Sequence, residues 1–156
     1  MSGETTMPRT VTIAGLAELV GADLGHSRWL TVDQPRIDMF ADATDDHQWI
    51  HIDTAAAENG PFGGTIAHGY LTLSLLIPLW SELLEIEDAT TKINYGLDRV
   101  RFPAPVPSGT RIRLQATVAE VTEVPGGVQV IVDAAIHAEG GSRPVCAARP
   151  VLRYLA

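Results

Sequence analysis

The chain of 156 residues contains a single cysteine, Cys146, so no disulfide can form within it. This scarcity is typical of a protein from a reducing compartment. Basic residues are also few, since 11 Lys and Arg face 19 Asp and Glu and leave a formal net charge of -8. Binding along nucleic acid phosphates needs a basic surface, so this balance argues against nucleic acid as a partner.

Long apolar runs and nucleotide-binding motifs are absent as well. The longest apolar run, 66–80, is interrupted by polar residues and by Pro78, and it is shorter than the ~20 residues of a membrane-spanning helix. Residues 1–5 contain no basic segment leading into an apolar one, so we expect no signal peptide. Neither a GxGxxG nor a GxxxxGK motif occurs, which leaves nicotinamide and nucleoside triphosphate chemistry unsupported. We therefore expect a soluble, cytoplasmic protein that needs no cofactor and has no membrane association.

What the chain does contain is the composition of an ordinary globular protein, with 46% hydrophobic and 19% charged residues. A chain of this length can bury about two thirds of its unfolded surface in one core and fold without metal or disulfide. Its 14 glycines and 10 prolines are spread over turns. We expect a single domain over residues 1–156, with residues 1–9 flexible.

Apolar spacing predicts several short helices in the first half of the chain. Apolar residues recur at helical intervals within 16–20, between two glycines. After an extended segment over 26–32, Asp33 is a candidate N-cap for a second helix that ends near Thr44. A third, alanine-rich helix is expected over 54–58.

The second half predicts one buried helix followed by a sheet. Residues 68–84 are apolar on every side of a helix, which indicates burial, and Pro78 predicts a kink or an early end. Four segments then alternate or are rich in β-branched residues, with glycine-containing turns between them. These expected strands are 92–102, 111–124, 128–137 and 146–155. The pattern predicts an α+β domain in which an antiparallel sheet wraps a long central helix.

The candidate functional stretch lies between these two halves. Asp46 and His51 stand five positions apart in a segment that favours a turn, and the glycine-rich loop 60–64 follows. That loop leads through His68 and Gly69 into the buried helix. The layout predicts an acid-base site beside an apolar slot, although on spacing alone an exposed surface turn is the commoner explanation for such a pair.

Four motifs together carry a resemblance to a known family. They are Asp46 to His51, Gly60-Pro61-Phe62-Gly63, the segment 68–74 (HGYLTLS) and the segment 94–106 (NYGLDRVRFPAPV). With them the chain resembles the MaoC-type dehydratases and, more closely, their NodN-like branch of (R)-specific enoyl-CoA hydratases, from about Trp29 to the C-terminus. The resemblance implies the hot-dog fold, which is a long central helix wrapped by an antiparallel sheet.

The resemblance also implies roles for individual residues. The catalytic aspartate and histidine of the family fall on Asp46 and His51, the oxyanion-binding amide falls on Gly69, and the serine of the central helix falls on Ser74. Many members have Gly before the aspartate and Asn-Pro between the pair, where this chain has Asp45 and Gln48-Trp49.

Other polar residues near the motif have alternative interpretations. We expect Trp49 to line or brace the site and His68 to support the start of the helix. His47, with Asp45, is the internal competitor for the catalytic roles. Ser74 is either an orienting hydroxyl or a helix hydroxyl bonded back to the preceding turn. His47 and His51 have the spacing of a zinc pair, but no third ligand is evident, so we expect no metal.

The implied function is reversible addition of water to trans-2-enoyl thioesters to give (3R)-3-hydroxyacyl thioesters, a hydro-lyase step of fatty acid metabolism. CoA or an acyl carrier protein would present the substrate, and we expect a homodimer or higher homo-oligomer. One alternative is a hot-dog acyl-CoA thioesterase, although 68–81 contains no carboxylate and Glu82 is the first. The other is a non-catalytic acyl-thioester-binding protein of the NodN type.

Overall fold

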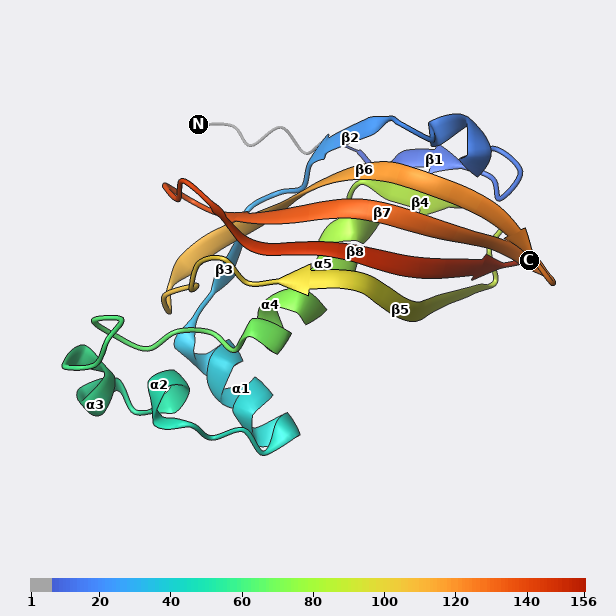
Figure 1. Cartoon of the computed structure of the whole chain (residues 1–156). Coiled ribbons are helices and arrows are strands. Elements are labelled where there is room, and N and C mark those ends of the chain that lie inside the picture. The colour runs from blue at the N-terminus through green and yellow to red at the C-terminus, as the bar shows by residue number, and fades with distance from the viewer. Residues whose placement is uncertain (1–6) are drawn as a thin grey trace.

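The main feature of the fold is a six-stranded sheet that curves over two consecutive helices, α4 (Gly69–Ser74) and α5 (Leu76–Ser81) (Figure 1). The structure is a computed structural model and describes residues 7–156. Within that range no helix is long and apolar enough to span a membrane. The flexibility expected for residues 1–9 concerns mostly residues outside the described range, and Arg9 already begins strand β1 (Arg9–Val11).

The large sheet is antiparallel throughout and has the order β2-β6-β7-β8-β5, with β3 also paired to β6. Its strands are β2 (Asp23–His26), β3 (Leu30–Val32), β5 (Thr91–Arg101), β6 (Thr110–Val124), β7 (Gly127–Ala138) and β8 (Pro144–Leu155). The four long strands confirm the segments predicted from alternation. The extended segment expected over 26–32 is divided, because the chain is irregular over 27–29.

A second, two-stranded parallel sheet pairs β1 with β4 (Leu84–Ile86). The sequence predicts neither strand, and its apolar pattern predicts a central helix as far as Leu84. That extension is wrong because the helix ends at Ser81 and Leu84 already pairs with Arg9. Strands of three residues are too short for an alternating pattern to distinguish them from a helix end.

The central helix packs one face beneath the sheet and is interrupted at Leu75, between α4 and α5. The expected burial on every side is wrong, because Tyr70, Ser74, Pro78 and Ser81 form an exposed face. Pro78 has no N–H to donate to the carbonyl of Ser74, so the regular helical bonding fails at this point. The predicted kink is thus present, three residues before the proline. Trp80 of α5 is buried, and its Nε1–H donates to the Tyr154 hydroxyl of β8 at 2.7 Å.

Three more helices form an arm beyond one end of the sheet (Figure 1). They are α1 (Gln34–Thr44), α2 (Trp49–Ile52) and α3 (Thr54–Glu58). The carboxylate of Asp33 accepts from the Arg36 amide at 3.1 Å, which confirms the predicted N-cap of α1. The short helix expected over 16–20 is the 3-10 helix η1 (Leu16–Leu19). The arm connects through residues 65–68 to the start of α4.

Candidate active site

The chain leaves α1 through a left-handed residue and turns toward the central helix. Asp45 has φ 59°, a conformation that favours glycine and that Asp and Asn adopt more readily than most other residues. Residues 46–48 have no regular structure, and α2 then begins at Trp49. The predicted turn therefore covers only the first part of the motif, and His51 lies on a short helix.

His51 is held by the peptide group of Ile66, at the end of the glycine-rich loop. The Ile66 amide donates to the Ile50 carbonyl at 3.0 Å, and Nδ1–H of His51 donates to the Ile66 carbonyl at 2.7 Å. The carbonyl can only accept, so the proton of a neutral His51 ring is on Nδ1. Nε2 is then the unprotonated nitrogen and can accept a proton.

Burial makes the neutral form of His51 the favoured one. His51 is only 7% exposed, and this burial lowers the pKa of His51 below its ordinary value. The hydrogen bond to Ile66 opposes the shift, His68 adds to it, and the Asp46 carboxylate again opposes it. The net direction is downward, so the ring is neutral at pH 7.

His68 brings the two candidate catalytic residues together. Its Nε2–H donates to the main-chain carbonyl of Asp46 at 2.9 Å, and its ring stacks on His51 with centroids 3.8 Å apart. One ring nitrogen of each histidine and a carboxylate oxygen of Asp46 all lie within 4.8 Å of one another. A single water can bridge groups at that separation, because each of its hydrogen bonds is about 2.8 Å long.

The same three residues are also the candidate metal ligands. Imidazole lone pairs lie in the plane of the ring, however, and the rings of His51 and His68 are only 24° from parallel. Two stacked rings cannot both aim a nitrogen at one ion between them with good geometry. The arrangement suits a bridging water better than a transition metal.

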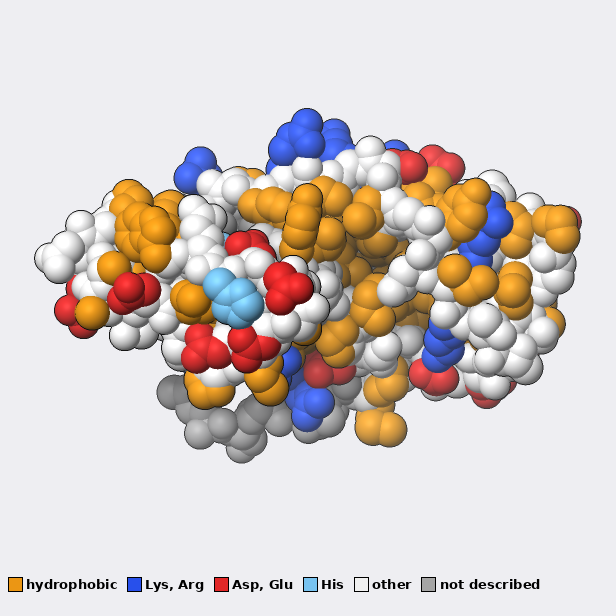
Figure 2. All heavy atoms as spheres, turned by 90° about the horizontal axis from the view of Figure 1, so that it is seen from below, with side chains coloured by type: hydrophobic (Ala, Val, Ile, Leu, Met, Phe, Trp, Pro, Cys, Tyr) orange, Lys and Arg blue, Asp and Glu red, His pale blue; other side chains and the backbone are white. Residues whose placement is uncertain are grey.

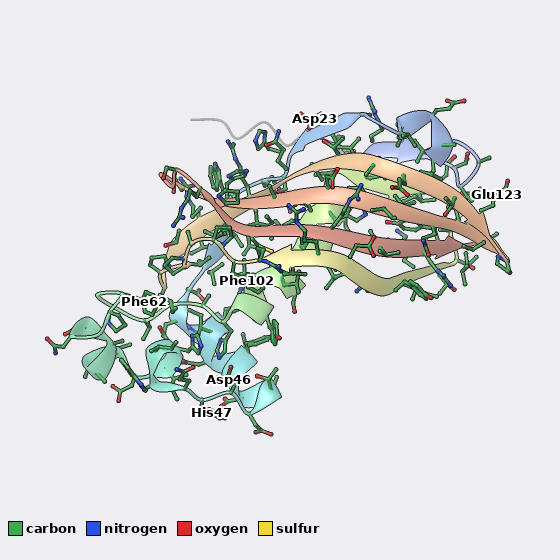
Figure 3. All side chains as sticks on the ribbon, in the orientation of Figure 1. Asp23, Asp46, His47, Phe62, Phe102 and Glu123 are labelled. Carbon is green, nitrogen blue, oxygen red and sulfur yellow. The ribbon has the colours of Figure 1, made fainter. Side chains whose placement is uncertain are left out.

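Gly69 opens α4 next to an apolar pocket of about 250 Å³. Its N–H has no hydrogen-bond acceptor within residues 7–156, and it lines the pocket together with Phe62 and Phe102. A Cβ at this position would lie 3.1 Å from the ring of Phe102. Only glycine therefore fits without displacing that ring, which lies beside α4 in Figure 3.

Ser74 and Trp49 lie apart from this cluster. The Ser74 hydroxyl donates to the Tyr70 carbonyl at 2.7 Å, so it bonds back to the preceding turn of α4, one of the two interpretations offered above. It lines a second hollow of about 210 Å³ with residues of α5, β5 and β8. Trp49 is 44% exposed and packs on Gly60, where a Cβ would lie 3.0 Å from its ring. Trp49 thus braces the glycine-rich loop.

His47 is exposed and bonds Asp42 at 2.9 Å on the outer side of the arm. That bond raises the pKa of His47, in the direction opposite to His51. Figure 2 shows carboxylates gathered on the arm around a histidine, beside a hollow bordered by hydrophobic side chains. His47 and His51 therefore lie in different environments, one exposed and one buried.

Three contributors to this site were given no role from the sequence. The Ile66 carbonyl is a main-chain group, so its residue type says nothing about it. Phe102 reaches Gly69 across 33 positions of sequence. Gln34, the first residue of α1, donates to the His51 carbonyl at 2.7 Å and accepts from the Thr65 hydroxyl at 2.6 Å. Gln34 thereby links the arm to the loop.

The chain is similar in sequence to known proteins. A family model described as "MaoC like domain" matches residues 16–139. The chain is 44% identical over 146 residues to 3-hydroxyacyl-thioester dehydratase Z of Mycobacterium tuberculosis, covering 93% of this chain and 97% of that protein. It is 51% identical over 112 residues to Nodulation protein N of Rhizobium leguminosarum bv. viciae, covering 70% of each chain.

Among solved structures, the chain is similar to the (R)-hydratase from A. caviae involved in PHA biosynthesis. The TM-score is 0.70 at 22% identity, covering 85% of this chain and 94% of that one. At this identity the likeness concerns the fold alone. It confirms the predicted α+β class and the hot-dog arrangement of a sheet wrapped around a central helix.

Proposed function

From the premise that the chain belongs to the MaoC-like domain family, we propose that it is an (R)-specific enoyl-CoA hydratase working as one cofactor-independent hot-dog domain. Its homologues include a protein named as a dehydratase, which supports a hydro-lyase reaction at the level of the family. One observation carries the finer proposal. The hydrogen bond from Nδ1–H of His51 to Ile66 leaves Nε2 as the nitrogen that can accept a proton, and His51 belongs to a cluster that also contains the Asp46 carboxylate.

In the proposed reaction one water is held between Asp46 and His51. Its oxygen bonds to C3 of the trans-2-enoyl thioester while its proton passes to Nε2 of His51. The electron pair of the double bond moves toward the thioester carbonyl, and the proton on Nε2 then bonds to C2. One molecule of water has been added, and the reverse steps remove it. Positioned acid-base groups of this kind contribute typically about 10²–10⁴ in rate.

The enolate-like oxygen needs a hydrogen-bond donor, and the free amide of Gly69 is the proposed one. An oxyanion donor is worth roughly 3 kcal/mol of barrier in enzymes that use one. The apolar pocket beside Gly69 supports binding of an acyl thioester. The acidic arm disfavours an anionic carrier on its own surface, so we place the CoA phosphates near Arg99 and Arg101 at the end of β5.

We also propose that the protein is a cytoplasmic homodimer that pairs through β5. This strand ends the sheet, so one row of its backbone groups has no strand partner within the described chain. Its side chains are exposed almost throughout, including three large hydrophobic residues. These are Ile93, Tyr95 and Leu97. A long unpaired edge that exposes apolar side chains is a template for pairing, and a two-fold axis would satisfy both copies at once.

The likeness to Nodulation protein N, whose name states no reaction, supports one alternative. In that case the chain would bind an acyl thioester without turning it over. The two functions share the pocket and the fold, and they differ only in whether Asp46 and His51 act on water.

The test is a hydration assay with crotonyl-CoA and longer trans-2-enoyl-CoAs. Its readout is the loss of the ultraviolet absorbance of the conjugated thioester. We expect turnover by the wild-type protein, an (R)-product on chiral analysis, and losses of about 10²–10⁴ for Asp46→Asn and His51→Gln. His47→Gln is the matched control and should retain activity, because His47 is exposed and bonds Asp42. Circular dichroism checks that each variant is folded.

Other outcomes of this assay identify the alternatives. Tight binding of the enoyl-CoA by calorimetry without any absorbance change would support the non-catalytic protein. Release of a free thiol would indicate a thioesterase. Full activity in folded Asp46→Asn would contradict the proposed pair.

A further inference from the structure

The main chain of His68 is already used to begin α4. Its carbonyl accepts from the amides of Leu71 and Thr72 at 3.1 and 3.2 Å, and any residue type could make these bonds. The helix start therefore does not require a histidine side chain. The ring is nevertheless almost completely buried, at 2% exposure, so contacts other than the helix start must account for the buried imidazole.

The ring of His68 fixes the main chain of Asp46. Its Nε2–H donates to the Asp46 carbonyl, which lies in the irregular segment 46–48. Asp46 is exposed and lies just after the left-handed residue Asp45. Within residues 7–156 this is the one side-chain hydrogen bond that ties the backbone of Asp46 to the body of the protein.

The same ring also supports His51. The two imidazoles are stacked 3.8 Å apart, and Phe40 of α1 packs against His68 at 4.9 Å with its ring tilted by 56°. His68 is thus held between a helix of the arm and the imidazole of His51. The Ile66 carbonyl fixes one edge of His51, and the stack fixes its plane.

The second nitrogen of His68 is a feature that packing alone does not explain. Nδ1 is buried and has no hydrogen-bond partner within the described residues. A buried polar atom without a partner destabilises the folded state, so a residue present only for packing would be better replaced by phenylalanine. The histidine keeps this unfavourable atom together with the Nε2–H that reaches Asp46.

We propose that His68 is a positioning residue that sets the distance between the Asp46 carboxylate and the His51 imidazole, the first through a hydrogen bond and the second through stacking. The proposal rests on the hydratase function proposed above. His68 does not take up or deliver a proton itself. It determines whether one water can contact both catalytic groups at the same time.

Two variants separate the two contacts. His68→Phe keeps a ring that can stack on His51 but removes the donor to Asp46. His68→Gln keeps a donor at a similar distance along the side chain but removes the stacked ring. For both we expect kcat to fall on the order of 10- to 100-fold, because a displacement of about 1 Å can cost about 10²-fold. KM should stay within about twofold, since the ring of His68 does not line either substrate-sized hollow.

The matched controls are His47→Phe and His47→Gln, made one position from Asp46 on the exposed side of the arm. They should leave both kcat and KM unchanged. A lower melting temperature of the His68 variants with unchanged kcat and KM would overturn the proposal, because that is the result expected if His68 only supports the helix start. Equal losses in the His47 controls would overturn it as well.

Hydrogen-deuterium exchange measures the positioning without turnover. In His68→Phe we expect faster exchange at the amides of 46–48, while α5 and β7 stay protected. If the wild-type protein does not hydrate enoyl thioesters, the hydratase proposal fails, and this exchange result still reports whether His68 holds Asp46. Unchanged exchange over 46–48 would show that it does not. His68→Gln provides the same measurement if His68→Phe does not fold.

Discussion

Replacing Gly69 by alanine places a methyl group against the ring of Phe102. The new Cβ would lie 3.1 Å from two ring carbons, whereas such carbons pack best at about 3.5–4.0 Å. The ring or the start of α4 must therefore move by roughly 0.4–0.9 Å. Phe102 is 39% exposed and can move outward, which limits the strain.

The stability and the activity of Gly69→Ala are expected to change by different amounts. Overpacking typically costs about 1–3 kcal/mol, but alanine in place of a helical glycine returns about 0.5–1 kcal/mol. The free energy of unfolding should thus fall by no more than about 2.5 kcal/mol. A shift of the Gly69 amide within this range of roughly 0.4–0.9 Å, in contrast, should lower kcat/KM for crotonyl-CoA by up to about 100-fold.

The assay compares Gly69→Ala, Phe102→Ala and the double variant by urea unfolding and by kcat/KM. Removing the ring gives the new methyl group space. The kcat/KM of the double variant should therefore be close to that of Phe102→Ala, so most of the loss caused by Gly69→Ala alone is recovered. Unchanged kcat/KM in Gly69→Ala would refute the role of the amide. If Gly69→Ala lowers kcat/KM equally with and without the Phe102 ring, the loss does not arise from contact with that ring, and this explanation is refuted.

Three further predictions concern acidity, the core and the backbone. Burial lowers the pKa of His51 below 6.5, so kcat/KM should stay constant above pH 6.5 and fall only as the pH drops through the lower folded-state value; a midpoint above 6.5 would contradict this. Because the unfolded chain binds that proton first, His51 also makes the protein less stable as the pH falls from 6.5, and urea unfolding of His51→Gln should lack this component. Tyr154→Phe leaves the buried indole N–H of Trp80 without an acceptor and should lower the free energy of unfolding by about 1–3 kcal/mol, whereas Tyr95→Phe, exposed by 57%, should change it little. At φ 59° a β-branched residue is strained, so Asp45→Val should destabilise the protein by about 1–2 kcal/mol in thermal unfolding, while Asp45→Gly should be neutral or stabilising.

The difference between Asp45 and the glycine common in the family has a simple physical meaning. The position requires a left-handed backbone, which glycine adopts freely and which aspartate tolerates better than most residues. The sequence shows the replacement but not the backbone angle that accounts for it. The prediction for Asp45→Gly tests this explanation directly.

Features that follow from neighbouring residues within one element could be predicted from the sequence. Alternation of apolar residues predicted the four long strands, and the N-cap at Asp33 predicted where α1 begins. Pro78 predicted the interruption of the central helix, because the missing N–H is a property of the residue alone. These signals are local, so they can be read from neighbouring positions.

Tertiary structure alone decided how the site is assembled. The bond from His68 to Asp46 joins residues 22 positions apart, and that from His51 to Ile66 joins residues 15 apart. In each bond the partners lie on different segments of the chain, so no period within one element relates them, and one partner is a main-chain carbonyl that every residue has. The pairing of β1 with β4 is of the same kind. Such contacts depend on where the folded chain brings its segments, and no pattern within a single segment records them.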